Sequence, residues 1–168
     1  MASIYLVLQA IPDLSAAPRD EFIVDVNLPT GYDPAARLCG AVRVEVSTLA
    51  ELEANLARGR TAFVLLMADR YDPAPTWLTL EQVAPLAEAA GVPIIVDAAA
   101  DYPTVPNPYL SQGADLVAYS GGKILRGPQG GHLHLILTSS SPNPHLILII
   151  ITDSPNPRHH HLIIIIIT

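Results

Sequence analysis

The sequence predicts an α/β domain built on a parallel, doubly wound sheet, and two observations lead to that prediction. Short apolar runs at 61–67, 94–96 and 116–119 hold few polar side chains and are partly β-branched, which is typical of strands covered on both faces. Stretches with a helical spacing of apolar residues lie between such runs. Strands that alternate with helices of about ten residues form parallel sheets with helices packed on their faces.

The first half of the chain is expected to alternate between strands and helices. A strand is expected at 21–27, and a short helix between Asp33 and Gly40, because a proline follows the capping aspartate. Residues 41–46 alternate between apolar and other side chains, which predicts a half-exposed strand. The helix expected at 48–57 has leucines spaced along one face and leads into the buried strand at 61–67.

The second half continues this alternation. Thr79-Leu-Glu-Gln82 matches a capping box and predicts a helix that runs to about Ala90. Gly91 and a following proline are expected to end that helix. A strand that ends at Asp97, a proline-rich loop and a strand that ends at Ser120 come next.

An acid and an amine follow two of these strands. Asp97 ends one strand, and Ser120-Gly-Gly-Lys123 follows the next. Ligands of open α/β sheets bind outside the carboxyl ends of the strands, so Asp97 and Lys123 are expected to share one site. The alternative is that Asp97 only caps a strand end and Lys123 is a solvated loop residue.

The pairing of these two residue types indicates a cofactor. Lys123 is the only lysine in the chain, and a lysine amine forms a Schiff base with a carbonyl such as that of pyridoxal 5'-phosphate (PLP). A carboxylate such as Asp97 that faces the pyridine nitrogen keeps it protonated, so that the ring can withdraw electrons. The glycines before the lysine, including Gly122, let the backbone approach a ligand closely.

At these residues the chain resembles a known family. Val-Asp-Ala-Ala-Ala, Gly-Ala-Asp-Leu-Val-Ala-Tyr-Ser-Gly-Gly-Lys and Leu-Arg-Gly-Pro-Gln resemble the fold-type-I PLP-dependent enzymes. The branch they resemble contains selenocysteine synthase-like proteins and D-glucosaminate-6-phosphate ammonia-lyase. The resemblance covers roughly residues 20–130 and is densest at 91–129. It implies an aspartate aminotransferase-like large domain.

The resemblance also implies roles for individual residues. Lys123 would form the internal aldimine, and Asp97 would be the partner of the pyridinium. Ser120 would bind the phosphate, and Ala99 would lie near the ring face. The remaining residues with implied roles are Gly122 in the cofactor loop and Arg126 and Gln129, which would shape the site or a subunit contact.

The same resemblance predicts how the chain is divided. Residues 1–20 are expected to be a ragged N-terminal segment, 21–130 a partial PLP-dependent large domain and 131–168 a separate tail. The family has an upstream segment that supplies a phosphate-cradling turn and a ring-stacking residue, and a C-terminal small domain. Neither has a match in this sequence, so the chain is expected to be a fragment of such an enzyme.

The tail consists of near-copies of one apolar segment. The copies lie at 132–138, 145–152 and 161–168, and Ser-Pro-Asn-Pro occurs twice between them. Isoleucine runs without charge or proline are prone to edge-to-edge strand pairing, so the tail is expected to self-associate, and a small β-meander is one arrangement it allows. The first copy could instead be the short strand that the family places after Gly-Pro-Gln. Consecutive histidines at 159–161 would point to alternating faces of a strand, so no metal site is expected there.

Composition excludes several classes of function. The formal net charge of −7 argues against a nucleic-acid-binding surface. The single cysteine, Cys39, cannot form an internal disulfide, which fits a reducing compartment and predicts a cytoplasmic protein. No apolar run reaches transmembrane length, and the N-terminal stretch lacks the basic region of a signal peptide.

The resulting hypothesis is a PLP-dependent lyase or transferase that acts on an amino acid or an amino sugar acid and releases ammonia. The resemblance implies a small-molecule amino substrate and a homo-oligomer, with no nucleic-acid or membrane partner. Two alternatives stay open. One is a selenium transferase-like enzyme or another class V-like aminotransferase. The other is a non-catalytic α/β fragment that self-associates through its tail.

Overall fold

The computed structural model describes residues 19–27, 40–68, 78–98, 101–102, 104 and 106–120, and the backbone of strands at 134–138, 146–152 and 161–167. The main sheet has six strands in the order β2-β1-β3-β4-β5-β6. Its strands are β1 (Glu21–Asp25), β2 (Val42–Val46), β3 (Thr61–Met67), β4 (Ile94–Asp97), β5 (Leu116–Ser120) and β6 (His134–Thr138).

The strand order confirms the predicted fold class. Strands β1 to β5 pair in parallel, and only β6 runs antiparallel, beside β5. The chain moves from β1 outward to β2 and then returns to the other side of β1 with β3. A reversal of this kind defines a doubly wound sheet, and ligands of such sheets bind near the reversal at the carboxyl edge.

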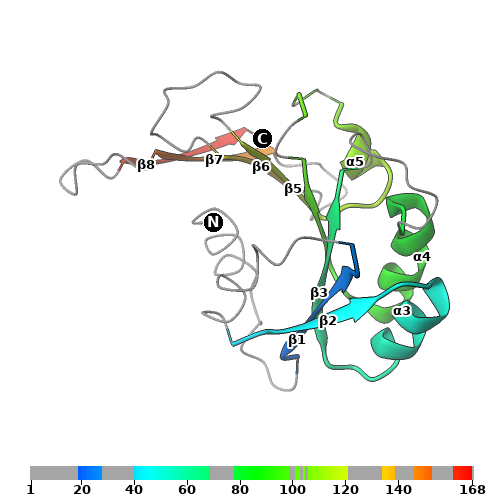
Figure 1. The fold of residues 1–168 in the computed structure, drawn as a ribbon. Helices are drawn as coiled ribbons and strands as arrows, with labels where there is room; N and C mark the ends of the chain where they lie inside the picture. Colours follow the sequence, from blue (N-terminus) through cyan, green and yellow to red (C-terminus); the bar gives the residue numbers. More distant parts are fainter. Residues whose placement is uncertain are drawn as a thin grey trace.

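Two helices cover one face of the sheet (Figure 1). Thr48 caps α3 (Leu49–Leu56) by accepting a hydrogen bond from the backbone N–H of Glu51. Thr79 and Gln82 form the predicted capping box of α4 (Leu80–Ala90), which ends at Gly91 with φ of 62°. Both helices begin directly after a threonine whose side chain satisfies a free backbone N–H group. The sequence predicts this cap for α4, whereas Thr48 was expected to lie within the helix that it caps.

Both faces of the sheet are buried. On the helix side, the sheet packs against Leu52 and Leu56 of α3 and against Val83 and Ala87 of α4. On the opposite side, the Phe22 and Phe63 rings stack with their centroids 5.3 Å apart. This two-sided burial explains why β1, β3 and β4 lack the apolar–polar alternation of a half-exposed strand.

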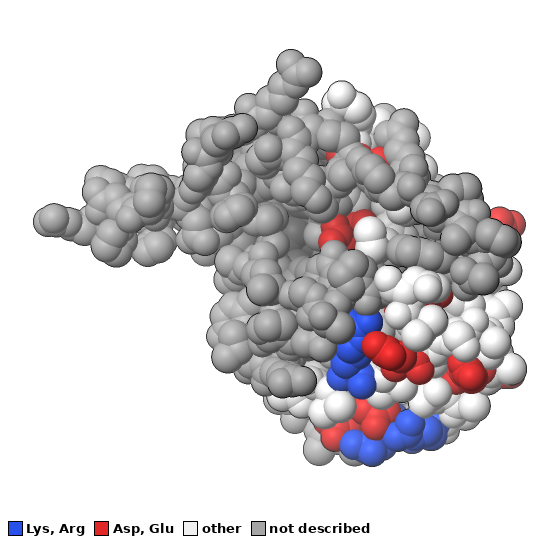
Figure 2. Space-filling model, in the orientation of Figure 1, with Lys and Arg blue, Asp and Glu red and all other residues white. Residues whose placement is uncertain are grey.

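An ion-pair cluster lies at the amino ends of β1 and β3. The buried carboxylate of Glu21 accepts a hydrogen bond from Arg58 at 2.7 Å and forms an ion pair with Arg60 at 3.1 Å. Arg60 also contacts Asp20 at 2.6 Å, and this guanidinium lowers the pKa of the Asp20 carboxyl. Figure 2 shows acidic and basic side chains adjoining at this end of the molecule. The cluster ties the segment that follows α3 to the start of β1.

One predicted loop contains a helix. The stretch after β4 was expected to be a proline-rich loop, but it includes α5 (Pro108–Ser111). Asn107 accepts hydrogen bonds from the backbone N–H groups of Tyr109 and Leu110, and Pro108 occupies the first turn. An N-cap residue followed by proline is a helix start. The helix expected between Asp33 and Gly40 lies outside the described residues.

The first copy of the tail repeat joins the main sheet. Strand β6 pairs antiparallel with β5, from Leu116 opposite Thr138 to Ser120 opposite His134. The other copies form an antiparallel pair, β7 (Leu146–Thr152) and β8 (His161–Ile167), and β7 lies beside β6 (Figure 1). The first copy therefore provides the strand expected after Gly-Pro-Gln, and the domain boundary at residue 131 stays a prediction. Within the described residues, no helix is long and apolar enough to cross a membrane.

Gly113, in the turn between α5 and β5, provides a test of helix–turn packing. Its φ is 104°, and a Cβ atom there would lie 2.9 Å from the Cβ of Ala84 on α4. We expect Gly113→Ala to lower the free energy of unfolding by about 2–4 kcal/mol, because the positive φ and the close contact both oppose a side chain.

The matched control for Gly113→Ala is Gly59→Ala. Gly59 also has a positive φ of 70°, but open space surrounds the position of its Cβ. Only the backbone effect acts there, so the expected loss is about 1–2 kcal/mol. Urea unfolding followed by circular dichroism measures both values. Equal losses would contradict a contribution from the contact with α4.

Candidate active site

The carboxyl ends of the parallel strands meet at one edge of the sheet, and Asp97 lies at this edge. In register, Asp97 is flanked by Met67 of β3 and Ala118 of β5. Its carbonyl accepts a hydrogen bond from the N–H of Ala68 at 2.9 Å, and the N–H of Ala98 donates to the carbonyl of Ala118 at 2.8 Å. The backbone on both sides of Asp97 is therefore held by its neighbours.

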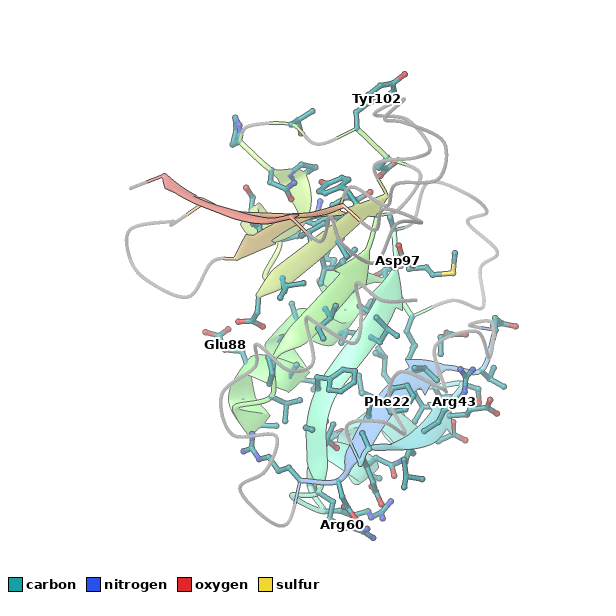
Figure 3. The ribbon with its side chains drawn as sticks, turned by 90° about the vertical axis from the view of Figure 1, so that its left-hand side faces the viewer. Phe22, Arg43, Arg60, Glu88, Asp97 and Tyr102 are labelled. Carbon is teal, nitrogen blue, oxygen red and sulfur yellow. The ribbon has the colours of Figure 1, made fainter. Side chains whose placement is uncertain are left out.

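The side chain of Asp97 belongs to the face of the sheet that α3 and α4 do not cover. Ile94 and Val96 pack in the core beneath the helices, and successive side chains of a strand point to opposite faces. Asp97 is half-buried there. Figure 3 shows it at the end of the sheet opposite to Arg60. A partly exposed carboxylate at this edge can accept a hydrogen bond from a charged donor of a ligand.

The segment after Asp97 is held by buried polar contacts. Asp101, which is 5% exposed, donates its N–H to the carbonyl of Ala98 at 2.9 Å and accepts a hydrogen bond from the Tyr109 hydroxyl. Asn107 donates from its side-chain amide to the Tyr119 hydroxyl at 2.6 Å. Burial raises the pKa of the Tyr119 phenol, the hydrogen bond from Asn107 acts in the opposite direction, and nearby Asp101 raises the pKa further.

Asp25, at the carboxyl end of β1, was not among the predicted site residues. It is 3% exposed. One oxygen accepts hydrogen bonds from the N–H and the side-chain amide of Asn27, both at 2.8 Å, and the other accepts from the N–H of Leu78 at 3.0 Å. One oxygen thus holds the local turn at Asn27, and the other joins β1 to the residue before the cap of α4. An aspartate two residues before an asparagine indicates a local turn, but nothing local indicates the contact with Leu78.

The predicted site residues are placed as follows. Asp97 ends β4 and Ser120 ends β5, the adjacent parallel strand, so their backbones lie at the same edge of the sheet. Ala99, Gly122 and Lys123 lie outside the described residues, as do Arg126 and Gln129. The roles assigned to all of them therefore stay predictions. Among the described side chains, no group of histidine, cysteine, aspartate and glutamate could hold a metal ion.

A cavity of about 450 Å³ lies away from Asp97. It is at the amino ends of β4 and β5, and Glu88, Gly91, Pro93 and Asp115 are among its lining residues. Asp115 accepts a hydrogen bond from the N–H of Ile94 at 2.8 Å, so this acid serves to hold the start of β4. The cavity and the candidate site are therefore at opposite ends of the same strands.

No family model matches this chain, and no curated protein matches it. Solved structures do. D-glucosaminate-6-phosphate ammonia-lyase is 29% identical with a TM-score of 0.57, over 68% of this chain and 32% of that chain. Alanine–glyoxylate aminotransferase from Nostoc sp. is 23% identical with a TM-score of 0.60, over 83% of this chain and 37% of that chain.

A third similar structure is an aspartate aminotransferase variant from Thermus thermophilus, 23% identical with a TM-score of 0.51, over 72% of this chain and 35% of that chain. The aminotransferases show that the fold is aspartate aminotransferase-like. The chain spans about a third of the length of each of these structures. All are enzymes whose names describe chemistry at an amino group.

Proposed function

We propose that this chain is part of a PLP-dependent lyase or transferase that acts on an amino acid or an amino sugar acid and releases ammonia. The observation that carries the proposal is the half-buried Asp97 carboxylate at the carboxyl edge of β4, beside the strand that leads through Ser120 to Lys123. The similar solved structures belong to the class of PLP-dependent enzymes that the sequence motifs resemble.

The residues at this edge suit such a cofactor. When bound, PLP supplies a carbonyl that bonds to amines and a ring that withdraws electrons from the substrate. Asp97 is acceptor-only when ionised and can hold a protonated ring nitrogen, and partial burial strengthens that charge pair relative to bulk water. Lys123 would bind the cofactor at rest and would then take the proton from the α-carbon of the substrate.

The reaction products depend on which bond breaks after the α-proton is removed. Once Lys123 had taken the α-proton, a β-hydroxyl would leave with the electron pair of its C–O bond, and the electron pair of the broken C–H bond would form a double bond between the α- and β-carbons. Hydrolysis of the resulting enamine would then release ammonia and a keto acid. A selenium transferase shares the early steps and differs in what is added after the hydroxyl leaves. Assays with D-glucosaminate 6-phosphate and with a seryl substrate plus a selenium donor separate these two reactions.

The direct test is to locate the residue that binds PLP. We expect borohydride treatment of the full chain with PLP to attach the cofactor to Lys123, because no other lysine is present. Peptide mapping by mass spectrometry identifies the labelled residue, and Lys123→Arg is the control that keeps the charge but should abolish labelling. Label on the Met1 amine alone, or no label, would refute the proposal.

A second candidate function is a non-catalytic fragment that self-associates. The observation that favours it is the pairing of two isoleucine-rich segments as β7 and β8. Strands of this composition add readily to strands of another copy. A chain that forms defined oligomers and shows no label at Lys123 would favour this function over the enzyme.

A further inference from the structure

The pairing between β4 and β5 is short, and other contacts must hold the segments that extend beyond it. Register is set by Ile95 opposite Leu116, Val96 opposite Val117 and Asp97 opposite Ala118. After Ala98 the chain leaves the sheet and returns through α5. The backbone ladder therefore does not by itself determine where the segment after Asp97 lies relative to the end of β5.

The side-chain amide of Asn107 forms hydrogen bonds at both its nitrogen and its oxygen, and these connect α5 to the end of β5. Its Nδ2 donates to the Tyr119 hydroxyl at 2.6 Å, and its Oδ1 accepts from the N–H groups of Tyr109 at 3.1 Å and Leu110 at 3.2 Å. Asn107 is 6% exposed and Tyr119 is 1% exposed. If the buried amide of Asn107 lost its hydrogen-bond partner, its desolvation would no longer be compensated. Conformations without the Asn107–Tyr119 hydrogen bond are therefore unfavourable.

Two further hydrogen bonds connect α5 to the residue that follows Asp97. The Tyr109 hydroxyl donates to the Asp101 carboxylate, and the N–H of Asp101 donates to the carbonyl of Ala98, which follows Asp97 directly. The path therefore runs from Asp97 through Asp101 and α5 to Tyr119. Tyr119 is the residue before Ser120, where the segment leading to Lys123 begins.

We propose that Asn107 and Tyr119 are positioning residues that fix the segment after Asp97 against the end of β5. They contact neither substrate nor cofactor, and they act by holding Ala98 and Asp101, which follow Asp97, against Tyr119 at the end of β5. The inference deepens the proposed function and rests on it for the identity of the site. The clamp itself, defined as the Asn107–Tyr119 hydrogen bond, is a property of the described residues.

The test removes the clamp from the full chain without removing the helix cap. Tyr119→Phe deletes only the hydroxyl. Asn107→Ser keeps a residue that caps helices well but is too short to reach Tyr119. Hydrogen exchange in the absence of PLP should show faster exchange at the amides of Ala98 and Asp101 in both variants, with unchanged exchange in β3.

A second readout concerns the proposed site. We expect either variant to weaken PLP binding by about tenfold, measured by absorbance titration, because small displacements of positioned groups carry large penalties. The double variant should bind PLP as tightly as either single variant, because each substitution removes the same hydrogen bond between Asn107 and Tyr119. Asn107→Asp should keep most of the wild-type affinity for PLP that Asn107→Ser loses. The carboxylate in this variant can cap α5 and can accept a hydrogen bond from the Tyr119 hydroxyl. The exposed Tyr102→Phe is the control.

The outcomes separate the clamp from the proposed function. If the wild-type chain binds no PLP but exchange at Ala98 and Asp101 still rises in the variants, the clamp stands and the proposed function fails. If the variants lose stability while PLP affinity is unchanged, the positioning role is wrong. Unchanged exchange at both amides, or additive losses in the double variant, would also overturn it.

Discussion

Changing Asp97 to asparagine should slow α-proton exchange of a bound amino substrate by about a hundredfold and weaken PLP binding by less than about tenfold. The reason is that asparagine keeps the size and a carbonyl oxygen but has no charge with which to hold a protonated ring nitrogen. Binding depends on many contacts, whereas the electron-withdrawing capacity of the ring depends directly on that proton.

Exchange of the α-proton for deuterium, followed by NMR, compares the two proteins, and absorbance titration gives their PLP affinities. Asp115→Asn is the matched control. It makes the same change beside the same strand pair, but at the amino end of β4, where Asp115 accepts one backbone hydrogen bond at 2.8 Å that an asparagine oxygen can also accept. Equal exchange rates in the wild type and Asp97→Asn would rule out the assigned role.

Deleting residues 139–168 should abolish most self-association of the chain while preserving the α/β sheet. The deletion removes β7 and β8, whose isoleucine-rich edges can pair with other copies, and it keeps β6 on the edge of the main sheet. Size-exclusion chromatography with light scattering measures the change. An elution profile identical to that of the full chain would contradict the role of the tail.

Comparing two deletions separates the role of β6 from that of β7 and β8. A longer deletion, of residues 131–168, also removes β6 and leaves β5 as an unpaired edge. We expect it to lower the free energy of unfolding by a few kcal/mol relative to the 139–168 deletion, because each lost ladder bond is worth about 1 kcal/mol. Ile164→Lys in the full chain is a milder test, because a charge opposite Ile149 opposes strand stacking.

Local signals in the sequence were sufficient for most elements. Helix α4 begins after the capping box at Thr79 and ends at Gly91, and β3 spans the whole predicted run from Thr61 to Met67. These boundaries depend on interactions within a few residues, such as a side chain that satisfies a free N–H group. α5 was missed because prolines outweighed the Asn107-Pro108 signal for a helix start.

The candidate site was predictable only in part. The sequence predicted that Asp97 would end a strand and that Ser120 would end the next one, because the apolar runs have clear limits. That these strands are adjacent and parallel follows from the fold class, which the alternating pattern indicates. The position of Lys123 relative to Asp97 lies outside the described residues and stays a prediction.

By itself, then, the sequence determined the fold class, the limits of the buried strands and the residue types at the edge of the sheet. Only the tertiary structure decided which polar groups hold that edge together. The Asp25 carboxylate accepts a hydrogen bond from the N–H of Leu78, 53 positions away, and the Asn107 amide donates one to the Tyr119 hydroxyl, 12 positions away. Such partners are chosen by the packing of whole elements, because a buried donor or acceptor must be satisfied by whatever group the fold brings beside it.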